Sequence, residues 1–207
     1  LNIFLEYLDG GCLRRHLERQ GFMSEDETAH ISREVLTGLS YLHSQGITHR
    51  DIKGANVLLS NDGAVKLADF GTSKCVEQES VVSGIKGTPH WMAPEVIRGQ
   101  ESPDGWFQAD VWSVGCTVVE MLTGKMPWPD MPNAMAAMFN IANGEPPPMS
   151  RCERVSAEAR SFIAACCVPD PKQRYTVERL MNHPFLARER PSPPPPPLRR
   201  EGVVLTG

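Results

Sequence analysis

Residues 49–56, HRDIKGAN, place three basic side chains, a carboxylate and an amide between two apolar stretches. Within and after this segment, Asn56 and Asp69 supply the hard oxygen ligands that suit Mg²⁺, which takes few protein ligands and completes its shell with phosphates and water. Asp51, kept off the metal, can accept a hydrogen bond from an incoming hydroxyl, and Lys53 can neutralise phosphoryl oxygens as charge shifts. The residue types therefore predict phosphoryl transfer, and a merely solvated loop is the plainer alternative.

These side chains converge only if the elements around them fold back on one another. Ser24 and Glu27 have the spacing of a capping box and open a long helix that stops near Gly46. The NDG sequence at 61–63 signals a hairpin turn, which carries Asp69 back toward Asn56. The predicted strands are 1–8, 57–59 and 65–68, and the predicted helices are 13–19, 24–46, 110–124, 133–143, 156–166 and 176–182. Residues 72–90 have no clear period and predict a mobile loop.

The composition bounds the class of protein. The 207 residues include 41% hydrophobic side chains and carry a formal net charge of −4, which argues against nucleic acid or an anionic membrane as the main partner. No apolar run reaches the roughly 18 residues of a membrane span. The six cysteines lack metal-ligand spacing and predict reduced thiols in a cytosolic or nuclear protein, with a disulfide framework as the alternative.

Both ends of the sequence carry information. Residue 1 is a Leu inside an apolar segment, so we expect the chain to be a piece of a longer one. The last segment, 189–207, is rich in proline and predicts an extended, disordered tail. Its PPPPLR sequence fits a ligand for SH3 domains, and a plain extension without a partner is the alternative.

Three motifs in order carry a resemblance to a known family. HRDIKGAN, then DFG at 69–71, then APE at 93–95 resemble the catalytic loop, metal-binding motif and activation-segment end of eukaryotic serine/threonine protein kinases. The resemblance covers residues 1–188. Small-molecule kinases of the aminoglycoside or choline type share an Asp…Asn…Asp skeleton but not GTPHWMAPE. The resemblance implies an α+β fold, the mostly helical C-terminal lobe of a kinase with a small β element.

The resemblance also implies roles for single residues, with ATP and Mg²⁺ as cofactors. Asp51 matches the catalytic base, Lys53 the lysine that contacts phosphate, and Asn56 and Asp69 the metal ligands. The adenine pocket would comprise Leu5 as gatekeeper, the main chain of Glu6 and Leu8, and Leu58 as its floor.

Further matches concern support and control. Thr88 is expected to bridge Asp51 and Lys53, and Asp110 to hold the backbone of the catalytic loop. Glu95 and Arg174 match a buried ion pair.

Arg50, just before the catalytic Asp, implies control by phosphorylation of the activation loop, since a phosphate would be its charge-assisted partner. The candidate acceptors are Ser80 and Ser83, ahead of Thr72 and Ser73.

Two side chains near these motifs have plainer readings. His49 is expected to pack beside Phe70 rather than to catalyse. Cys12 lies at the lip of the predicted nucleotide pocket and could react with electrophiles, although an ordinary small residue explains it as well.

Gly54-Ala55, LADFGTSK and GTPHWMAPEVI resemble the group of MAP kinase kinase kinases, with p21-activated and sterile-20-like kinases as the alternative. The substrate would then be a protein, with a MAP kinase kinase as one candidate, and the location cytoplasmic.

The sequence departs from the family above the hinge. It has no G-x-G-x-x-G loop, no lysine in a V-A-I-K context and no helix glutamate to pair with it, so we expect these 207 residues to lack the N-terminal lobe. Two hypotheses follow: the lower lobe of a longer active kinase, or a truncated, inactive chain that acts as a binding or scaffold module. The filled catalytic positions favour the first.

Overall fold

The computed structural model of the chain describes residues 6–75, 87–100, 105–148 and 155–188. Its order is β1(Gly11–Cys12), α1(Leu13–Gln20), α2(Glu25–Ser44), β2(Ile47–Thr48), η1(Gly54–Asn56), β3(Val57–Leu59), β4(Val65–Leu67), η2(Phe70–Thr72), β5(Lys74–Cys75), η4(Pro89–Trp91), α3(Pro94–Ile97), α4(Gly105–Thr123), α5(Ala134–Ala142), α6(Ala157–Cys166), α7(Val177–Met181) and η5(Pro184–Ala187). Helices dominate and the strands are short, so the predicted α+β class with a small β element is confirmed.

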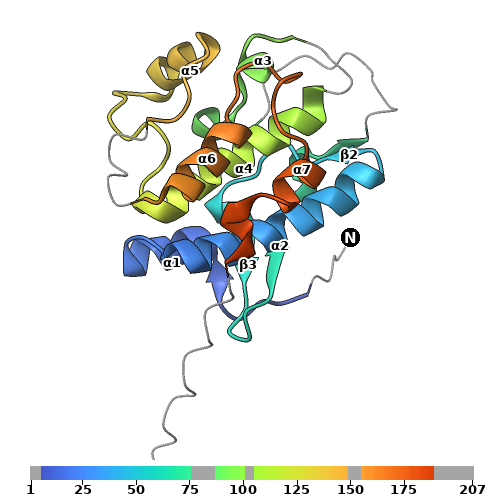
Figure 1. Cartoon of the computed structure of the whole chain (residues 1–207), viewed down its shortest axis with the longest axis vertical. Helices are drawn as coiled ribbons and strands as arrows, with labels where there is room; N and C mark the ends of the chain where they lie inside the picture. Colours follow the sequence, from blue (N-terminus) through green and yellow to red (C-terminus); the bar gives the residue numbers. More distant parts are fainter. Residues whose placement is uncertain (1–5, 76–86, 101–104, 149–154, 189–207) are drawn as a thin grey trace, which may run out of the picture.

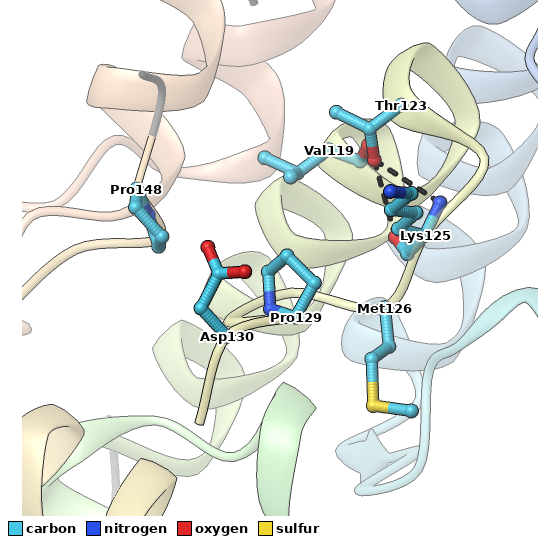
Figure 2. Close-up of a pocket in the computed structure, with 7 residues that line it drawn as sticks. All are labelled: Val119, Thr123, Lys125, Met126, Pro129, Asp130 and Pro148. Atoms are coloured by element: carbon cyan, nitrogen blue, oxygen red, sulfur yellow. Dashed lines mark hydrogen bonds between the residues drawn. The ribbon is translucent and has the colours of Figure 1, made fainter. Parts of the chain in front are cut away.

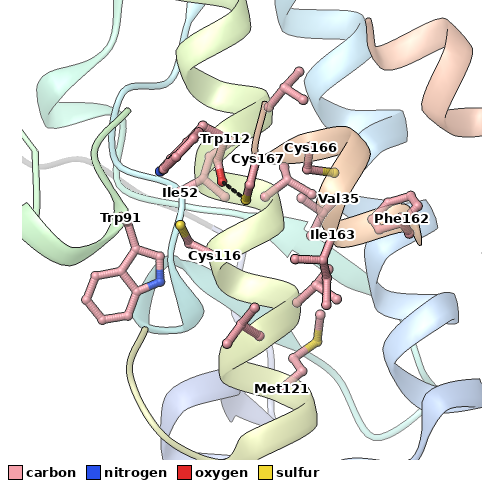
Figure 3. Packing of buried hydrophobic residues seen from close by; sticks show 14 of the residues in the cluster. Val35, Ile52, Trp91, Trp112, Cys116, Met121, Phe162, Ile163, Cys166 and Cys167 are labelled. Carbon is pink, nitrogen blue, oxygen red and sulfur yellow. Dashed lines mark hydrogen bonds between the residues drawn. The ribbon is translucent and has the colours of Figure 1, made fainter. Parts of the chain in front are cut away.

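The helix α4 is the centre of the packing. It crosses the middle of the molecule, with α2 and α6 alongside it and α5 standing off to one side (Figure 1). Trp112, Cys116 and Met121 on α4 are almost fully buried in the same core as Val35 of α2 and Ile163 of α6 (Figure 3). A helix so apolar on every side has to be covered by neighbours all round, and that makes α4 a rigid platform for the loops that touch it.

Local sequence signals explain the long helix α2. Its N-cap residue Ser24 accepts a hydrogen bond from the Glu27 amide (3.2 Å), and the Glu27 carboxylate accepts one from the Ser24 amide (2.9 Å). The predicted capping box is therefore present. The helix ends at Ser44, and Gly46 follows with a φ of 68°, a left-handed conformation that glycine adopts at little cost.

Two predicted boundaries need correction. The helix predicted at 110–124 begins at Gly105, so Asp110 lies in its second turn rather than at its head. The segment predicted as a strand at 1–8 lies partly outside the described residues, and its described part, 6–8, belongs to no strand. The sequence PDG at 103–105 resembles a turn and hid the first turn of α4.

The small sheets bring together the segments that carry the predicted catalytic residues. In one sheet β3 pairs antiparallel with β1 and with β4, with Val57 opposite Leu67. In the other, β2 pairs with β5, so that Thr48 lies opposite Lys74. The second pairing joins the segment before the catalytic loop to the segment after DFG, inside the region predicted as an unpatterned loop.

Among the described helices, none combines the length and the apolarity that crossing a membrane requires. The four cysteines whose state is described, Cys12, Cys116, Cys166 and Cys167, are free thiols.

Candidate active site

The Asp51 carboxylate lies at the centre of a compact set of donors. It accepts hydrogen bonds from Lys53 Nζ (2.7 Å), Thr88 Oγ1 (2.8 Å) and Asn56 Nδ2 (3.0 Å). Lys53 Nζ also donates to Thr88 Oγ1 (2.6 Å), so the side chains of Asp51, Lys53 and Thr88 all contact one another. Burial disfavours the charged carboxylate, but these hydrogen bonds and the charge of Lys53 outweigh it and lower the pKa of Asp51. The carboxylate is therefore ionised at neutral pH and can accept a proton.

The catalytic loop is fixed from below by Asp110. This carboxylate, 1% exposed, accepts from the amides of His49 (2.9 Å) and Arg50 (2.8 Å). Its Oδ2 also lies 3.0 Å from Nε2 of His43, near the end of α2. Arg50 has a φ of 70°, which costs energy for a residue with a side chain. The three contacts of Asp110 thus hold a strained turn directly before Asp51.

His49 packs rather than presenting a free ring. It is fully buried, its Nε2 lies 3.1 Å from the Ala68 carbonyl, and its ring centroid lies 5.4 Å from that of Phe70. Its Nδ1 accepts from the Asp51 amide (3.3 Å). The ring therefore connects the catalytic loop with the segment around Asp69.

The two predicted metal ligands flank the β3–β4 hairpin at its open end. Asn56 precedes β3 and its carbonyl accepts from the Ala68 amide (2.9 Å), one residue before Asp69. The Asn56 amide nitrogen donates to the Asp51 carbonyl (2.8 Å) and carboxylate, which turns its Oδ1 away from these contacts. Asp69 is exposed and has a φ of 64°, and its Oδ1 accepts from the Gly71 amide (3.2 Å). One amide oxygen and one carboxylate fit Mg²⁺, which keeps most of its shell for water and phosphate.

Sequence reasoning missed Glu120, which holds the other side of the catalytic loop. Its Oε2 accepts from the Gly54 amide (3.0 Å) and from Trp91 Nε1 (3.2 Å). A Cβ on Gly54 would lie 2.8 Å from Glu120 Oε1, so only glycine fits there unless the carboxylate moves. Burial raises the pKa of Glu120, although the two donors act against the shift. Glu120 is one of two acids in a largely apolar helix, and a buried acid must find partners, which is the signal in the sequence.

Glu95 and Arg174 form a buried ion pair. Arg174 Nη1 and Nη2 donate to the two Glu95 oxygens at 2.7 and 3.0 Å, and both residues are less than 5% exposed. Arg174 also donates to the carbonyls of Val168 (2.9 Å) and Gln108 (2.6 Å). These contacts tie α3, at the end of the APE motif, to α4 and to the segment before α7.

The predicted nucleotide face is open by comparison. Leu8 is buried and its carbonyl accepts weakly from the Gly11 amide (3.4 Å), whereas the Glu6 side chain is exposed and pairs with Lys66. Leu58 lies on β3 opposite Cys12, and both are half-buried. Leu58 and Cys12 therefore lie side by side, as expected if Leu58 forms the floor of the predicted adenine pocket and Cys12 lies at its edge.

Several predicted residues lie outside the described part of the chain: Leu5, Ser80, Ser83 and the tail at 189–207. Ser73 is described, and its hydroxyl donates to the His49 carbonyl (3.3 Å).

Two cavities near the end of α4 differ in what they can hold. One of about 150 Å³ lies beside Glu120, with Leu17, Trp91 and Met126 among its walls. The other, lined by Val119, Thr123, Lys125, Met126, Pro129, Asp130 and Pro148, has about 10 Å³ (Figure 2). The second has room for about one water, so only the first gives solvent and small groups access to the Glu120 side of the loop.

Comparison with known proteins follows the same motifs. The family model described as Protein kinase domain matches residues 1–186. Mitogen-activated protein kinase kinase kinase 2 of Arabidopsis thaliana is 45% identical over 190 residues, which is 90% of this chain and 28% of that protein. Mitogen-activated protein kinase kinase kinase 3 of Homo sapiens is 46% identical over 191 residues, 89% of this chain and 29% of that protein. The chain therefore spans somewhat under a third of the length of these relatives.

Proposed function

Because the chain belongs to the protein kinase family, we propose that this protein transfers the γ-phosphoryl group of ATP to Ser or Thr hydroxyls of other proteins. The observation that carries the proposal is the Asp51 carboxylate, ionised and held by Lys53, Thr88 and Asn56. A catalytic base needs this protonation state and a fixed direction toward the attacking hydroxyl.

The described residues divide the chemistry among them. Asp51 orients the substrate hydroxyl and accepts its proton. Lys53, whose ammonium donates to both Asp51 and Thr88, reaches the phosphoryl oxygens and stabilises their charge. Asn56 and Asp69 would hold Mg²⁺, which when bound neutralises charge on the phosphates. Lys53 and Thr88 support a preference for Ser and Thr acceptors, as the resemblance implies.

The relatives support a finer proposal. Their names place them as kinases of MAP kinase kinases, so we assign this protein to the same group, with a MAP kinase kinase as its substrate and the cytoplasm as its location. Adenine would be held by the main chain of Glu6 and Leu8 above Leu58. The proposed domain is 1–188, and the proline-rich tail at 189–207 is proposed as an SH3 ligand. The Arg199→Glu variant of the tail should lose binding to a panel of SH3 domains, and unchanged binding would remove that part.

The test uses the full natural chain, with whatever precedes residue 1. The chain should phosphorylate a Ser/Thr protein acceptor with ATP and Mg²⁺, and Asp69→Asn should abolish transfer while leaving the unfolding temperature unchanged. The matched control is Asp170→Asn, an exposed carboxylate far along the chain, which should retain full activity. No turnover by the natural chain, together with a stable partner, would instead favour a binding module. Equal activity in Asp69→Asn would exclude the proposed metal role.

A further inference from the structure

Arg50 is held at both its backbone and its side chain. Its amide donates to Asp110 Oδ1 (2.8 Å), and its Nε donates to Thr48 Oγ1 (3.2 Å). Its guanidinium carbon lies 4.2 Å from the ring centroid of Trp106, in the first turn of α4. The loop before Asp51 is therefore attached to α4 twice, once by a carboxylate and once by an indole.

The position of Arg50 bears on both sides of the active site. Asp51 follows it directly, so a change in the left-handed Arg50 backbone moves the proposed base. Its carbonyl would lie 2.9 Å from a Cβ placed on Gly87, the residue before Thr88. Arg50 thus lies against Gly87, and the next residue, Thr88, donates to Asp51. Arg50 therefore borders both the loop that carries Asp51 and the segment at 87–88.

The chemistry of the contact explains how Trp106 can act. A half-buried guanidinium is costly unless a group of opposite character lies beside it, and the negative face of an indole is such a group. Stacking uses the flat face of the guanidinium, whereas oxygen acceptors bind in its plane. An indole and a phosphate can therefore restrain the same arginine, and either restraint makes the other less necessary.

We propose that Trp106 is a positioning residue that holds Arg50 by a cation–π contact and keeps the Asp51 loop in place without a phosphate on the activation segment. The inference rests on the proposed function and adds a mode of regulation to it. Activity then depends on phosphorylation only weakly while Trp106 is present. It becomes dependent on phosphorylation when the ring is removed.

The experiment compares the full natural chain with Trp106→Leu, which keeps apolar bulk, and Trp106→Phe, which keeps a π-face. Each is assayed as purified and after phosphatase treatment, with the phosphate content read from the intact mass and myelin basic protein as acceptor. After phosphatase, Trp106→Leu should fall about five- to tenfold below the natural chain, and Trp106→Phe should stay within about twofold. In the phosphorylated form the deficit of Trp106→Leu should shrink, because the phosphate restrains Arg50.

The opposite results are equally definite. If the activity of Trp106→Leu is lowered equally with and without phosphate, the ring is merely structural and the inference is overturned. The inference is also overturned if dephosphorylated Trp106→Leu is as active as the dephosphorylated natural chain. If the intact mass shows no phosphate on any variant, the test is the comparison of Trp106→Leu and Trp106→Phe with the natural chain after phosphatase treatment. Tyr41→Ala removes an exposed ring from α2 and should change nothing.

A stability cycle separates this inference from the proposed function. Trp106→Leu, Arg50→Met and the double variant are unfolded thermally. If the cation–π contact exists, the sum of the stability losses in the two single variants exceeds the stability loss in the double variant. This holds whether or not any form is active. Additive losses would contradict the contact, whereas absent turnover in every form contradicts the kinase proposal alone.

Discussion

The underside of the proposed active site and its predicted nucleotide face are built in opposite ways. Below the catalytic loop, Asp110 and Glu120 of α4 are 1% and 6% exposed and accept hydrogen bonds from the loop. On the predicted nucleotide face, Tyr7, between Glu6 and Leu8, is 87% exposed, and Phe70 of the DFG motif is 51% exposed. A buried acid with several donors fixes what it touches, whereas an exposed ring restrains little. The two buried acids of α4 therefore fix the loop that carries Asp51 more firmly than the exposed rings fix the predicted nucleotide face.

The largest effect on stability should come from the buried ion pair. Glu95→Gln leaves Arg174 as an uncompensated buried charge and should lower the free energy of unfolding by about 3–5 kcal/mol. Glu18→Gln, in the exposed pair with Arg14, is the matched control and should cost under about 1 kcal/mol. Denaturant unfolding of both variants measures the difference. Similar losses in the two variants would show that burial does not make the Glu95–Arg174 pair contribute more to stability than the exposed Arg14–Glu18 pair.

Asp110→Asn should have the next largest effect on stability. An asparagine keeps one acceptor oxygen, so the amide of His49 or Arg50 is left unpaired, at a cost of about 1–3 kcal/mol. Because the strained Arg50 backbone is then released, activity of the full natural chain should fall more than stability does. Asp170→Asn serves again as the exposed control. An Asp110→Asn chain of natural activity would break the link between α4 and the loop.

Glu120→Gln should show its effect through pH. The pKa of Glu120 is raised in the folded state above its ordinary value of 4.5, so the folded chain keeps this proton to higher pH than the unfolded chain. Stability is therefore lost as pH rises from about 4.5 through the folded pKa. The Gln variant lacks this loss, so its stability relative to the natural chain should rise between pH 4 and pH 7. Thermal unfolding against pH measures it, with Glu145→Gln as the exposed control. A flat difference would contradict the direction of the shift.

The smallest effect should come from the open face. Phe70→Ser removes an exposed ring whose only described ring contact is with His49, and it should change the free energy of unfolding of this chain by about 0.5 kcal/mol or less. It should also raise solubility, because apolar surface is removed. A loss above about 2 kcal/mol would mean that the nucleotide face is packed after all.

Much of this arrangement could be read from the residues. Ser24 and Glu27 predicted the start of α2, the NDG turn predicted the β3–β4 hairpin, and the motifs identified the family. Glu120 could not be placed, because a helix pattern does not say which turn meets the catalytic loop. The β2–β5 pair, two residues in each strand, is too short to leave a period and depends on tertiary contacts.

The most direct measurement is phosphoryl transfer from ATP to a Ser/Thr protein by the full natural chain and by its Asp51→Asn variant. Asn keeps the shape and one acceptor oxygen, which can accept from Lys53 or from Thr88, but its amide cannot take a proton. The rate should fall by about 10²–10⁴-fold, with the unfolding temperature little changed. A rate within about threefold of the natural chain would contradict the central role given to Asp51.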